Sequence, residues 1–176
     1  KQAEEALRAL TLTDYLTSLY NRRGFMMLAD QQVRIAKRTQ HAMVLLFADV
    51  DGLKKINDTW GHPEGDRALM EVAALLKNTF READIVARLS GDEFVAMPME
   101  TKPGAPESVT ARLDTNLAIL NAAENRRYAL SLSIGLATFD PEHPCSIEEL
   151  MAQADAAMYE QKQRKRQAAA HAQRAR

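Results

Sequence analysis

The sequence predicts an α+β domain with a ferredoxin-like βαββαβ core, in which helices flank a central antiparallel sheet. Three observations support this class. Short apolar runs that fit strands alternate with longer segments whose apolar residues recur at helical spacing. Two of the runs, 84–89 and 94–97, are separated by a break short enough for a hairpin. This hairpin interrupts the strand–helix alternation once, as the βαββαβ order requires.

The composition is that of an ordinary globular domain. The 176 residues are 46% hydrophobic and 27% charged, with a formal net charge of -1. A chain of this length can bury one core, and its near-zero charge gives no electrostatic argument for nucleic-acid or membrane binding. No apolar run approaches the ~20 residues that span a bilayer. The lone Cys145 is compatible with a reducing compartment.

The first half of the chain predicts three helices and one strand. Residues 1–12 are interpreted as the end of a linker helix that arrives from an upstream domain, with a native N-terminal helix as the alternative. After a turn-like segment, a helix is expected over 24–38. The apolar run 42–52 predicts a strand covered on both faces. The stretch 56–66 has the composition of a turn, and a helix is expected over 63–80.

The second half continues with a loop and a helix over 108–122. Alternation over 128–139 predicts a strand, in which Gly135 marks a bulge or a close approach. The last helix is predicted to begin at Ser146, because Glu149 three residues later completes a capping box. Its C-terminal tail either extends the helix or frays.

Acidic residues stand at the ends of two predicted strands. Period 2 places Asp49 and Asp51 on one side of their strand and Val50 on the other. In this topology Asp49 should meet Asp92 and Glu93 at one edge of the sheet. Clustered carboxylates cannot all stay ionised without a partner, and a hard divalent cation such as Mg²⁺ supplies one. The cluster predicts metal-assisted phosphoryl or nucleotidyl transfer, by analogy with polymerase palm domains and nucleotide cyclases; solvated turn acids are the alternative.

Longer motifs extend along nearly the whole chain. The stretches DYLTSLYNRRGF, DVDGLKKINDTWGHPEGD, READIVARLSGDEF, SLSIGLA and ADAAMYEQK occur in this order. On these motifs the region 13–176 resembles the GGDEF domain of diguanylate cyclases, with SGDEF in the signature. The resemblance implies that two GTP molecules are condensed into cyclic di-GMP and two pyrophosphates at a homodimer interface. It also implies control by an upstream sensor and a cytoplasmic location, alone or as the cytoplasmic portion of a larger sensor protein.

The resemblance assigns catalytic and metal-binding roles to residues of this chain. Asp92, ranked before Glu93, is expected to accept the proton of the 3′-hydroxyl, which a positioned carboxylate can do. Lys54 is expected to stabilise the transition state. The cofactor would be Mg²⁺, with Mn²⁺ as the alternative. Its implied ligands are Asp49, the Val50 carbonyl, Asp92 and Glu93.

The same resemblance assigns residues that bind GTP. Asp66 can accept hydrogen bonds from guanine N1–H and N2–H₂ together, and backbone amides at a helix start can hold phosphate. Asn57 alone would be interpreted as a helix or turn cap. The implied GTP-binding residues are Gly52, Leu53, Asn57, His62, Asp66, Lys162 and Arg166. Arg164 and Lys165 fit a solvated helix end equally well.

A second site is implied by the spacing Arg81-x-x-Asp84 ahead of the signature. It resembles the family's inhibitory site for the cyclic di-GMP product, since Arg can stack on guanine and bond its edge. A local ion pair is the alternative. Arg88 either assists product binding or covers apolar surface with its stem.

The chain departs from the family pattern at several positions. Ser90 replaces the first signature Gly, which would cost about 1 kcal/mol if that position required a positive φ. Ser18 replaces another Gly, and the residues after Lys162 also differ, which puts the role of Arg166 in doubt. A catalytically silent module that binds GTP or cyclic di-GMP as a signalling receptor, or a dimerising scaffold, therefore remains as an alternative function.

Overall fold

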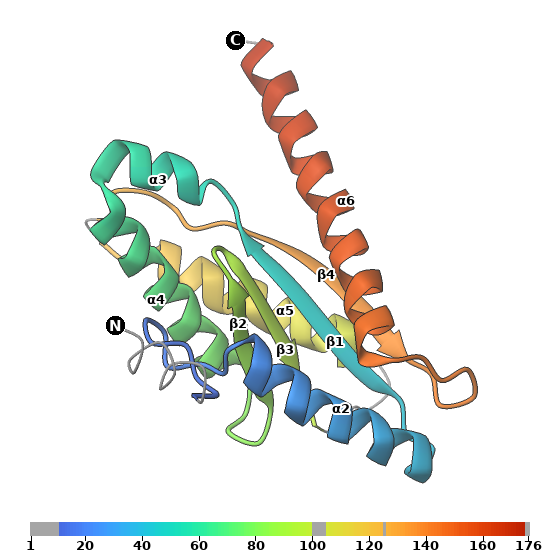
Figure 1. The fold of residues 1–176 in the computed structure, drawn as a ribbon. Coiled ribbons are helices and arrows are strands. Elements are labelled where there is room, and N and C mark those ends of the chain that lie inside the picture. The colour runs from blue at the N-terminus through green and yellow to red at the C-terminus, as the bar shows by residue number, and fades with distance from the viewer. Residues whose placement is uncertain (1–10, 100–104, 125, 175–176) are drawn as a thin grey trace.

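The computed structural model describes residues 11–99, 105–124 and 126–174. The predicted linker helix lies outside these residues, except for its last two positions. Four strands and five helices are formed by the described residues, in the order drawn in Figure 1. They are α2 (Arg22–Thr39), β1 (Met43–Val50), α3 (Leu53–Trp60), α4 (His62–Thr79), β2 (Ile85–Ser90), β3 (Glu93–Met97), α5 (Ala105–Asn121), β4 (Leu132–Phe139) and α6 (Ile147–Arg174).

The four strands form one antiparallel sheet in the order β2-β3-β1-β4. The helices α3 and α4 connect β1 to β2, the hairpin connects β2 to β3, and α5 connects β3 to β4. This is the βαββαβ arrangement, so the predicted ferredoxin-like core is confirmed. The central position of β1 next to the hairpin strand β3 follows from it.

Helices cover both faces of the sheet (Figure 1), which is why every residue of β1 is buried. Leu46, Ala48 and Val50 belong to the core that β1 shares with α4 and α5. Leu45 and Phe47 belong to the second core, which α2 and α6 complete. The strict alternation of the two sets confirms the predicted period of β1.

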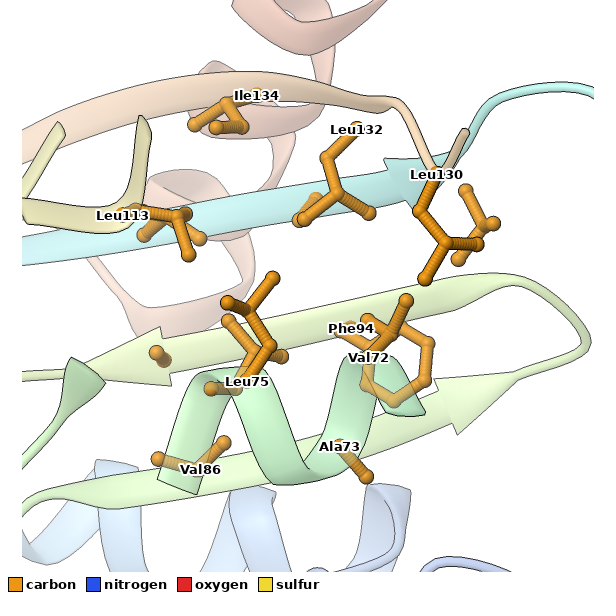
Figure 2. Packing of buried hydrophobic residues seen from close by; sticks show 14 of the residues in the cluster. Val72, Ala73, Leu75, Val86, Phe94, Leu113, Leu130, Leu132 and Ile134 are labelled. Carbon is orange, nitrogen blue, oxygen red and sulfur yellow. The ribbon is translucent and has the colours of Figure 1, made fainter. Parts of the chain in front are cut away.

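Figure 2 shows how the first core is built. Val72 and Leu75 of α4 lie over the hairpin strands, in the same cluster as Phe94 from β3. Leu113 of α5 and Leu132 of β4 close the other side of the cluster. A fully buried Phe or Leu side chain contributes about 2 kcal/mol each, so this core holds α4 and α5 on the sheet.

Helix α6 lies directly on β4 and β1. A Cβ on Gly135 would come within 1.9 Å of the Ala154 carbonyl oxygen, so the predicted close approach at Gly135 is confirmed. The predicted capping box is also present: Ser146 N–H donates to Glu149, and Glu149 N–H donates to the Ser146 hydroxyl. The helix extends through the tail, yet no helix in the described segments is long and apolar enough to cross a membrane.

Two expectations about local structure were wrong. The stretch 56–66 was expected to be a turn, but α3 runs to Trp60 and α4 begins at His62, with only Gly61 between them. Its polar composition hid the helix, because Ile56 is the one residue of α3 that is buried. The strand expected from residue 128 begins at Leu132, because the Tyr128 ring instead packs against the indole ring of Trp60.

Candidate functional site

Three acidic residues stand where β1 ends beside the hairpin turn: Asp49, Asp92 and Glu93. Asp49 pairs with Glu93 across β1 and β3, and the Val50 N–H donates to the Asp92 carbonyl at 3.0 Å. That bond makes Asp49 and Glu93 a pair without direct backbone hydrogen bonds between them, the type in which opposing side chains approach most closely. The chain segments that carry these residues therefore lie side by side, as expected, although the carboxylate oxygens of Asp49, Asp92 and Glu93 do not all lie within 4.8 Å of one another.

Asp49 is the most buried member of this cluster, with 6% of its surface exposed. Burial raises the pKa of Asp49 above its ordinary value, and the neighbouring charge of Asp92 raises it further, while the Lys162 ammonium acts in the opposite direction. Lys162 Nζ donates to the Asp49 carboxylate at 2.6 Å. Additional positive charge near Asp49 would therefore stabilise its ionised form.

Asp51 projects to the same side of β1 and serves a different purpose. It accepts hydrogen bonds from the hydroxyls of Ser131 and Ser133, both at 2.6 Å, and from Lys165 Nζ at 2.9 Å. Burial would raise the pKa of Asp51, but these donors outweigh it and lower the value. All three donors come from β4, the residues before it, or α6. Asp51 therefore fixes the end of β1 to its neighbours.

Lys165 was missed as part of this edge. A solvated helix end is one of the two interpretations that its sequence allows, but its ammonium donates to the Leu132 carbonyl at 2.5 Å as well as to Asp51. The available signal was its spacing from Lys162, because residues three apart share a helix face. Arg166 lies on the same helix and is exposed, whereas Arg164 pairs with Glu160 on the surface.

The chain leaves β1 through a turn that starts α3. Gly52 is the N-terminal cap residue of α3 and has a φ of 75°, a conformation in which Gly is favoured. A Cβ there would meet no atom within 4 Å. The first N–H groups of a helix have no partner within it, and here they begin at Leu53 and Lys54. This end of α3 can therefore receive an anion beside the carboxylate cluster.

The residues expected to read guanine lie at the corner between α3 and α4. A Cβ on Gly65 would come within 1.8 Å of Asn57 Oδ1, so the absence of a side chain at Gly65 leaves room for the Asn57 amide. Asp66 follows Gly65 and is exposed, and His62 at the start of α4 is exposed as well. The two helices thus bring Asn57 and Asp66 to one corner although they are nine positions apart.

The Arg81-x-x-Asp84 motif lies at the opposite end of β2 from the carboxylate cluster. The Asp84 carboxylate accepts hydrogen bonds from the backbone N–H groups of Arg81 at 2.8 Å and Met99 at 3.0 Å. Both motif residues line a pocket of about 470 Å³ together with Lys77 and Tyr20. The pocket offers cationic and aromatic groups next to each other.

Arg88 does not line that pocket. It points toward the turn between β2 and β3, which contains Gly91 and Asp92 and is called the signature turn below. Its guanidinium donates to the Gly91 carbonyl at 3.0 and 2.8 Å and to the Asp14 carboxylate at 3.2 Å. Burial would raise the pKa of Asp14, but bonds from Thr17 and the charge of Arg88 lower it overall. Arg88 thus joins the hairpin turn to the segment before α2.

Ser90 fits the signature turn without backbone strain. Among the described residues, a positive φ outside glycine occurs at Ser18 and Gln40, not at Ser90. The cost considered for Ser90 therefore does not arise, and the positive φ falls on Gly91 instead, at 39°. The Ser90 hydroxyl donates to the Glu93 carboxylate at 2.5 Å.

The donor set at the cluster fits a hard divalent metal ion. Asp49, Asp92 and Glu93 supply only oxygen, which Mg²⁺ and Mn²⁺ prefer. The pKa of Asp49 is raised by burial and also by the neighbouring charge of Asp92, and a bound cation would favour the ionised form. Among the described residues, the acidic group whose ligand atoms already lie within 4.8 Å of one another is a different one, Asp140 and Glu142 with His143, and it is exposed beyond the far end of β4.

Comparison with known proteins identifies close counterparts of this arrangement. The family described as "Diguanylate cyclase, GGDEF domain" matches residues 11–168. Diguanylate cyclase DosC from Escherichia coli K12 is 38% identical over 165 residues, which cover 93% of this chain and 35% of DosC. The bifunctional diguanylate cyclase/cyclic di-GMP phosphodiesterase MucR from Pseudomonas aeruginosa is 35% identical over 92% of this chain and 23% of MucR. The chain thus spans about a third or less of these curated relatives.

Solved structures agree with the sequence matches. A fragment of YfiN from Pseudomonas aeruginosa that comprises only the GGDEF domain aligns with a TM-score of 0.78 and 34% identity. The alignment covers 86% of this chain and 89% of the fragment. The GGDEF domain of DgcB from Caulobacter crescentus, solved in complex with c-di-GMP, aligns with a TM-score of 0.76 and 30% identity over 87% and 91% of the two chains.

Proposed function

The chain belongs to the diguanylate cyclase GGDEF domain family, and on this premise we propose that it condenses two GTP molecules into cyclic di-GMP and two pyrophosphates. The observation that carries the proposal is the placement of Asp49, Asp92 and Glu93 on adjoining segments at the end of β1, beside Lys162 and the first turn of α3. Negative ligands, a cation and free helix N–H groups are what a metal–triphosphate substrate needs.

GTP would lie across this edge with its base at the α3–α4 corner. Asp66 would accept from guanine N1–H and N2–H₂, with Asn57 and His62 beside it. Adenine lacks that pair of donors and would leave a carboxylate without partners. The phosphates would lie over the N–H groups of Gly52 and Leu53, with Lys54, Lys162 and Arg166 providing positive charge.

The chemistry assigned to the cluster is a proton transfer with substitution at phosphorus. The 3′-oxygen of one GTP bonds to the α-phosphorus of the other, the bond from that phosphorus to the bridging oxygen breaks, and pyrophosphate leaves. Asp92 would accept the 3′-hydroxyl proton, with Glu93 beside it. Mg²⁺, or Mn²⁺ as the alternative, would be held by Asp49, the Val50 carbonyl, Asp92 and Glu93 and would neutralise developing phosphate charge.

Catalysis would require two copies of this domain. Each copy offers one such site, whereas the product contains two guanosine units, so two sites must face each other in a homodimer. An upstream sensor joined through residues 1–12 would control how the copies meet. Such a protein would act in the cytoplasm, alone or as the cytoplasmic portion of a larger sensor. A fragment without that sensor should therefore be slow when dilute.

The proposal is tested by incubating the purified protein with GTP and Mg²⁺ and separating the products by chromatography. We expect cyclic di-GMP, and its loss in Asp92→Asn, with Asp155→Asn as a control because that exposed carboxylate lies on α6. GTP binding without turnover at any protein concentration would instead support the silent receptor. A protein that binds neither GTP nor cyclic di-GMP would be neither a cyclase nor a receptor, and the dimerising scaffold would be the remaining function.

We also propose that the product binds at Arg81 and Asp84 and inhibits synthesis. The pocket beside these residues contains Lys77 and Tyr20, which suit phosphate and guanine. Arg81→Ala should relieve inhibition by added cyclic di-GMP and leave the initial rate unchanged. An unaltered inhibition curve would remove this site, and it would leave the proposed synthesis itself intact.

A further inference from the structure

Helix α3 is short and is held mainly by its packing on α4. It contains eight residues, of which Ile56 alone is buried. Helices this short are marginal without tertiary contacts. Yet α3 carries Asn57, which must be aligned with Asp66 on the next helix to read a base. The position of Asn57 therefore depends on what contacts the rest of α3.

The last residue of α3 supplies such a contact. The indole ring of Trp60 packs against the ring of Tyr128, with ring centroids 5.0 Å apart and planes tilted by 35°. Aromatic pairs at this separation contribute about 0.5–1.5 kcal/mol beyond the area they bury. Trp60 lies one helical turn after Asn57, so the contact fixes the end of α3 nearest to the base-reading residue.

Tyr128 also contacts the second helix of the corner. Its hydroxyl donates to a carboxylate oxygen of Glu64 at 3.2 Å. Glu64 lies in the first turn of α4, two residues before Asp66. One side chain therefore contacts both helices that carry the expected base-reading residues.

Tyr128 itself is held in place by the loop between α5 and β4. Arg126 pairs with Glu71 of α4 at 2.7 Å and donates to the Tyr128 carbonyl at 3.3 Å. At the base of the loop, Asn121 and Leu130 exchange two hydrogen bonds of 2.8 Å. These bonds give Tyr128 a defined position against which α3 and α4 can be aligned.

We propose that Trp60 and Tyr128 are positioning residues that set the alignment of Asn57 with Asp66, and thereby the preference of the site for guanine. This inference rests on the proposed function, because it needs a guanine nucleotide at that corner. Neither ring has to touch the reacting atoms. What the contact controls is whether an amide and a carboxylate on two helices reach the same base edge together.

The test compares binding of GDP and IDP, which carry the same phosphates and differ only in the 2-amino group of the base. In the wild-type protein with Mg²⁺, GDP should bind more tightly, because IDP lacks one donor to Asp66. Trp60→Ala and Tyr128→Ala should weaken GDP binding about tenfold and IDP binding much less. The GDP-to-IDP ratio should therefore fall toward one, which a general loss of stability would not produce.

Milder variants separate alignment from folding. Trp60→Phe keeps an aromatic ring and should restore most of the wild-type ratio, whereas Tyr128→Phe loses only the bond to Glu64 and should reduce the ratio by about threefold. Ile119→Ala is the control, because it truncates an exposed apolar side chain on α5. Trp60 is the only tryptophan in the chain, so its fluorescence can be followed as GDP is added to the variants that keep it.

The possible outcomes distinguish this inference from the proposed function. Suppose that the wild-type protein prefers GDP and that the folded Phe and Ala variants bind GDP and IDP with unchanged affinity. This result would overturn the positioning role and leave the proposed function standing. Equal weakening of both nucleotides would also overturn it, since it would indicate a general effect on the site. A wild-type protein that binds no guanine nucleotide would overturn the proposed function and the inference together.

Discussion

The guanidinium of Arg88 lies 3.2 Å from the Asp14 carboxylate, and both side chains are largely buried, with 12% and 16% of their surfaces exposed. The same guanidinium donates two hydrogen bonds, of 3.0 and 2.8 Å, to the Gly91 carbonyl in the signature turn. The turn that presents Asp92 is therefore connected to the segment that precedes α2. A displacement of that segment would reach the carboxylate cluster through one side chain.

Arg88→Met should lower the free energy of unfolding by about 2 kcal/mol, because it leaves the Asp14 carboxylate and the Gly91 carbonyl without their shared donor. Cyclic di-GMP synthesis should fall with it, since the turn that carries Asp92 loses support. Urea denaturation and product chromatography measure the two effects. Arg34→Met is the control, because its pair with Asp30 is exposed and should contribute under about 0.5 kcal/mol.

The contribution of Asp14 to stability should depend on pH. Its pKa is lowered from the ordinary value of 3.8, so the ionised form is favoured in the folded state. A lowered pKa gives stability that is fully present above the unfolded value and is lost as the pH falls through the folded value. Denaturation across acidic pH should show wild type more stable than Asp14→Asn above pH ~4, with the difference decreasing as the pH falls below it and vanishing below the folded-state pKa. A difference that grew in acid would contradict this assignment.

Ser18→Gly should stabilise the protein by about 0.5–1 kcal/mol. Ser18 has a φ of 58°, which is strained for a residue with a Cβ, although glycine recovers only part of the cost because it is more flexible when unfolded. Ser90→Gly is the matched comparison. It should not stabilise, because Ser90 has no positive φ and loses its bond to Glu93. Thermal denaturation of both variants checks this: the melting temperature should rise for Ser18→Gly and should not rise for Ser90→Gly.

Gly65→Ala should impair nucleotide binding with little change in stability. The added methyl would overlap the Asn57 amide, which can rotate away but then no longer faces the base. Gly135→Ala should behave in the opposite way, because its methyl would meet backbone atoms of Ala154 and Met158 that cannot move alone. We expect a loss of about 2 kcal/mol there. GDP titration and urea denaturation of both variants, read together, check the contrast.

Lys165→Met should loosen the second half of α6. The Lys165 ammonium bonds Asp51 and the Leu132 carbonyl, and its loss should cost about 1 kcal/mol because the side chain is partly exposed. Hydrogen exchange in α6 after residue 160 should accelerate. Arg164→Met, one position earlier but paired only on the surface, should leave the exchange unchanged. Equal rates in both variants would show that Lys165 does not hold the helix.

Local patterns in the sequence were sufficient for the order of the strands and for every helix of the described residues except α3, and they placed the acidic residues at strand ends. Period 2 through β1 predicted Asp49 and Asp51 on one side and Val50 on the other, because alternation is a property of any extended chain. The structure shows that the first side faces α6 and the second faces α4. The short break at Gly91 and Asp92 specified the hairpin. Once β1 was central, the meeting of Asp49 with Glu93 followed from topology.

Only the tertiary structure decided which partners these residues take. Lys162 and Asp49 are 113 positions apart, and no local period relates them; their pairing depends on how closely α6 lies on β4. Alternation predicted that Tyr128 lies in a strand, but in the structure its ring packs against the ring of Trp60 on α3. Periodicity indicates which face of an element is buried. The contacts between two packed elements depend instead on the distance and the rotation between them, and these are set only when the cores form.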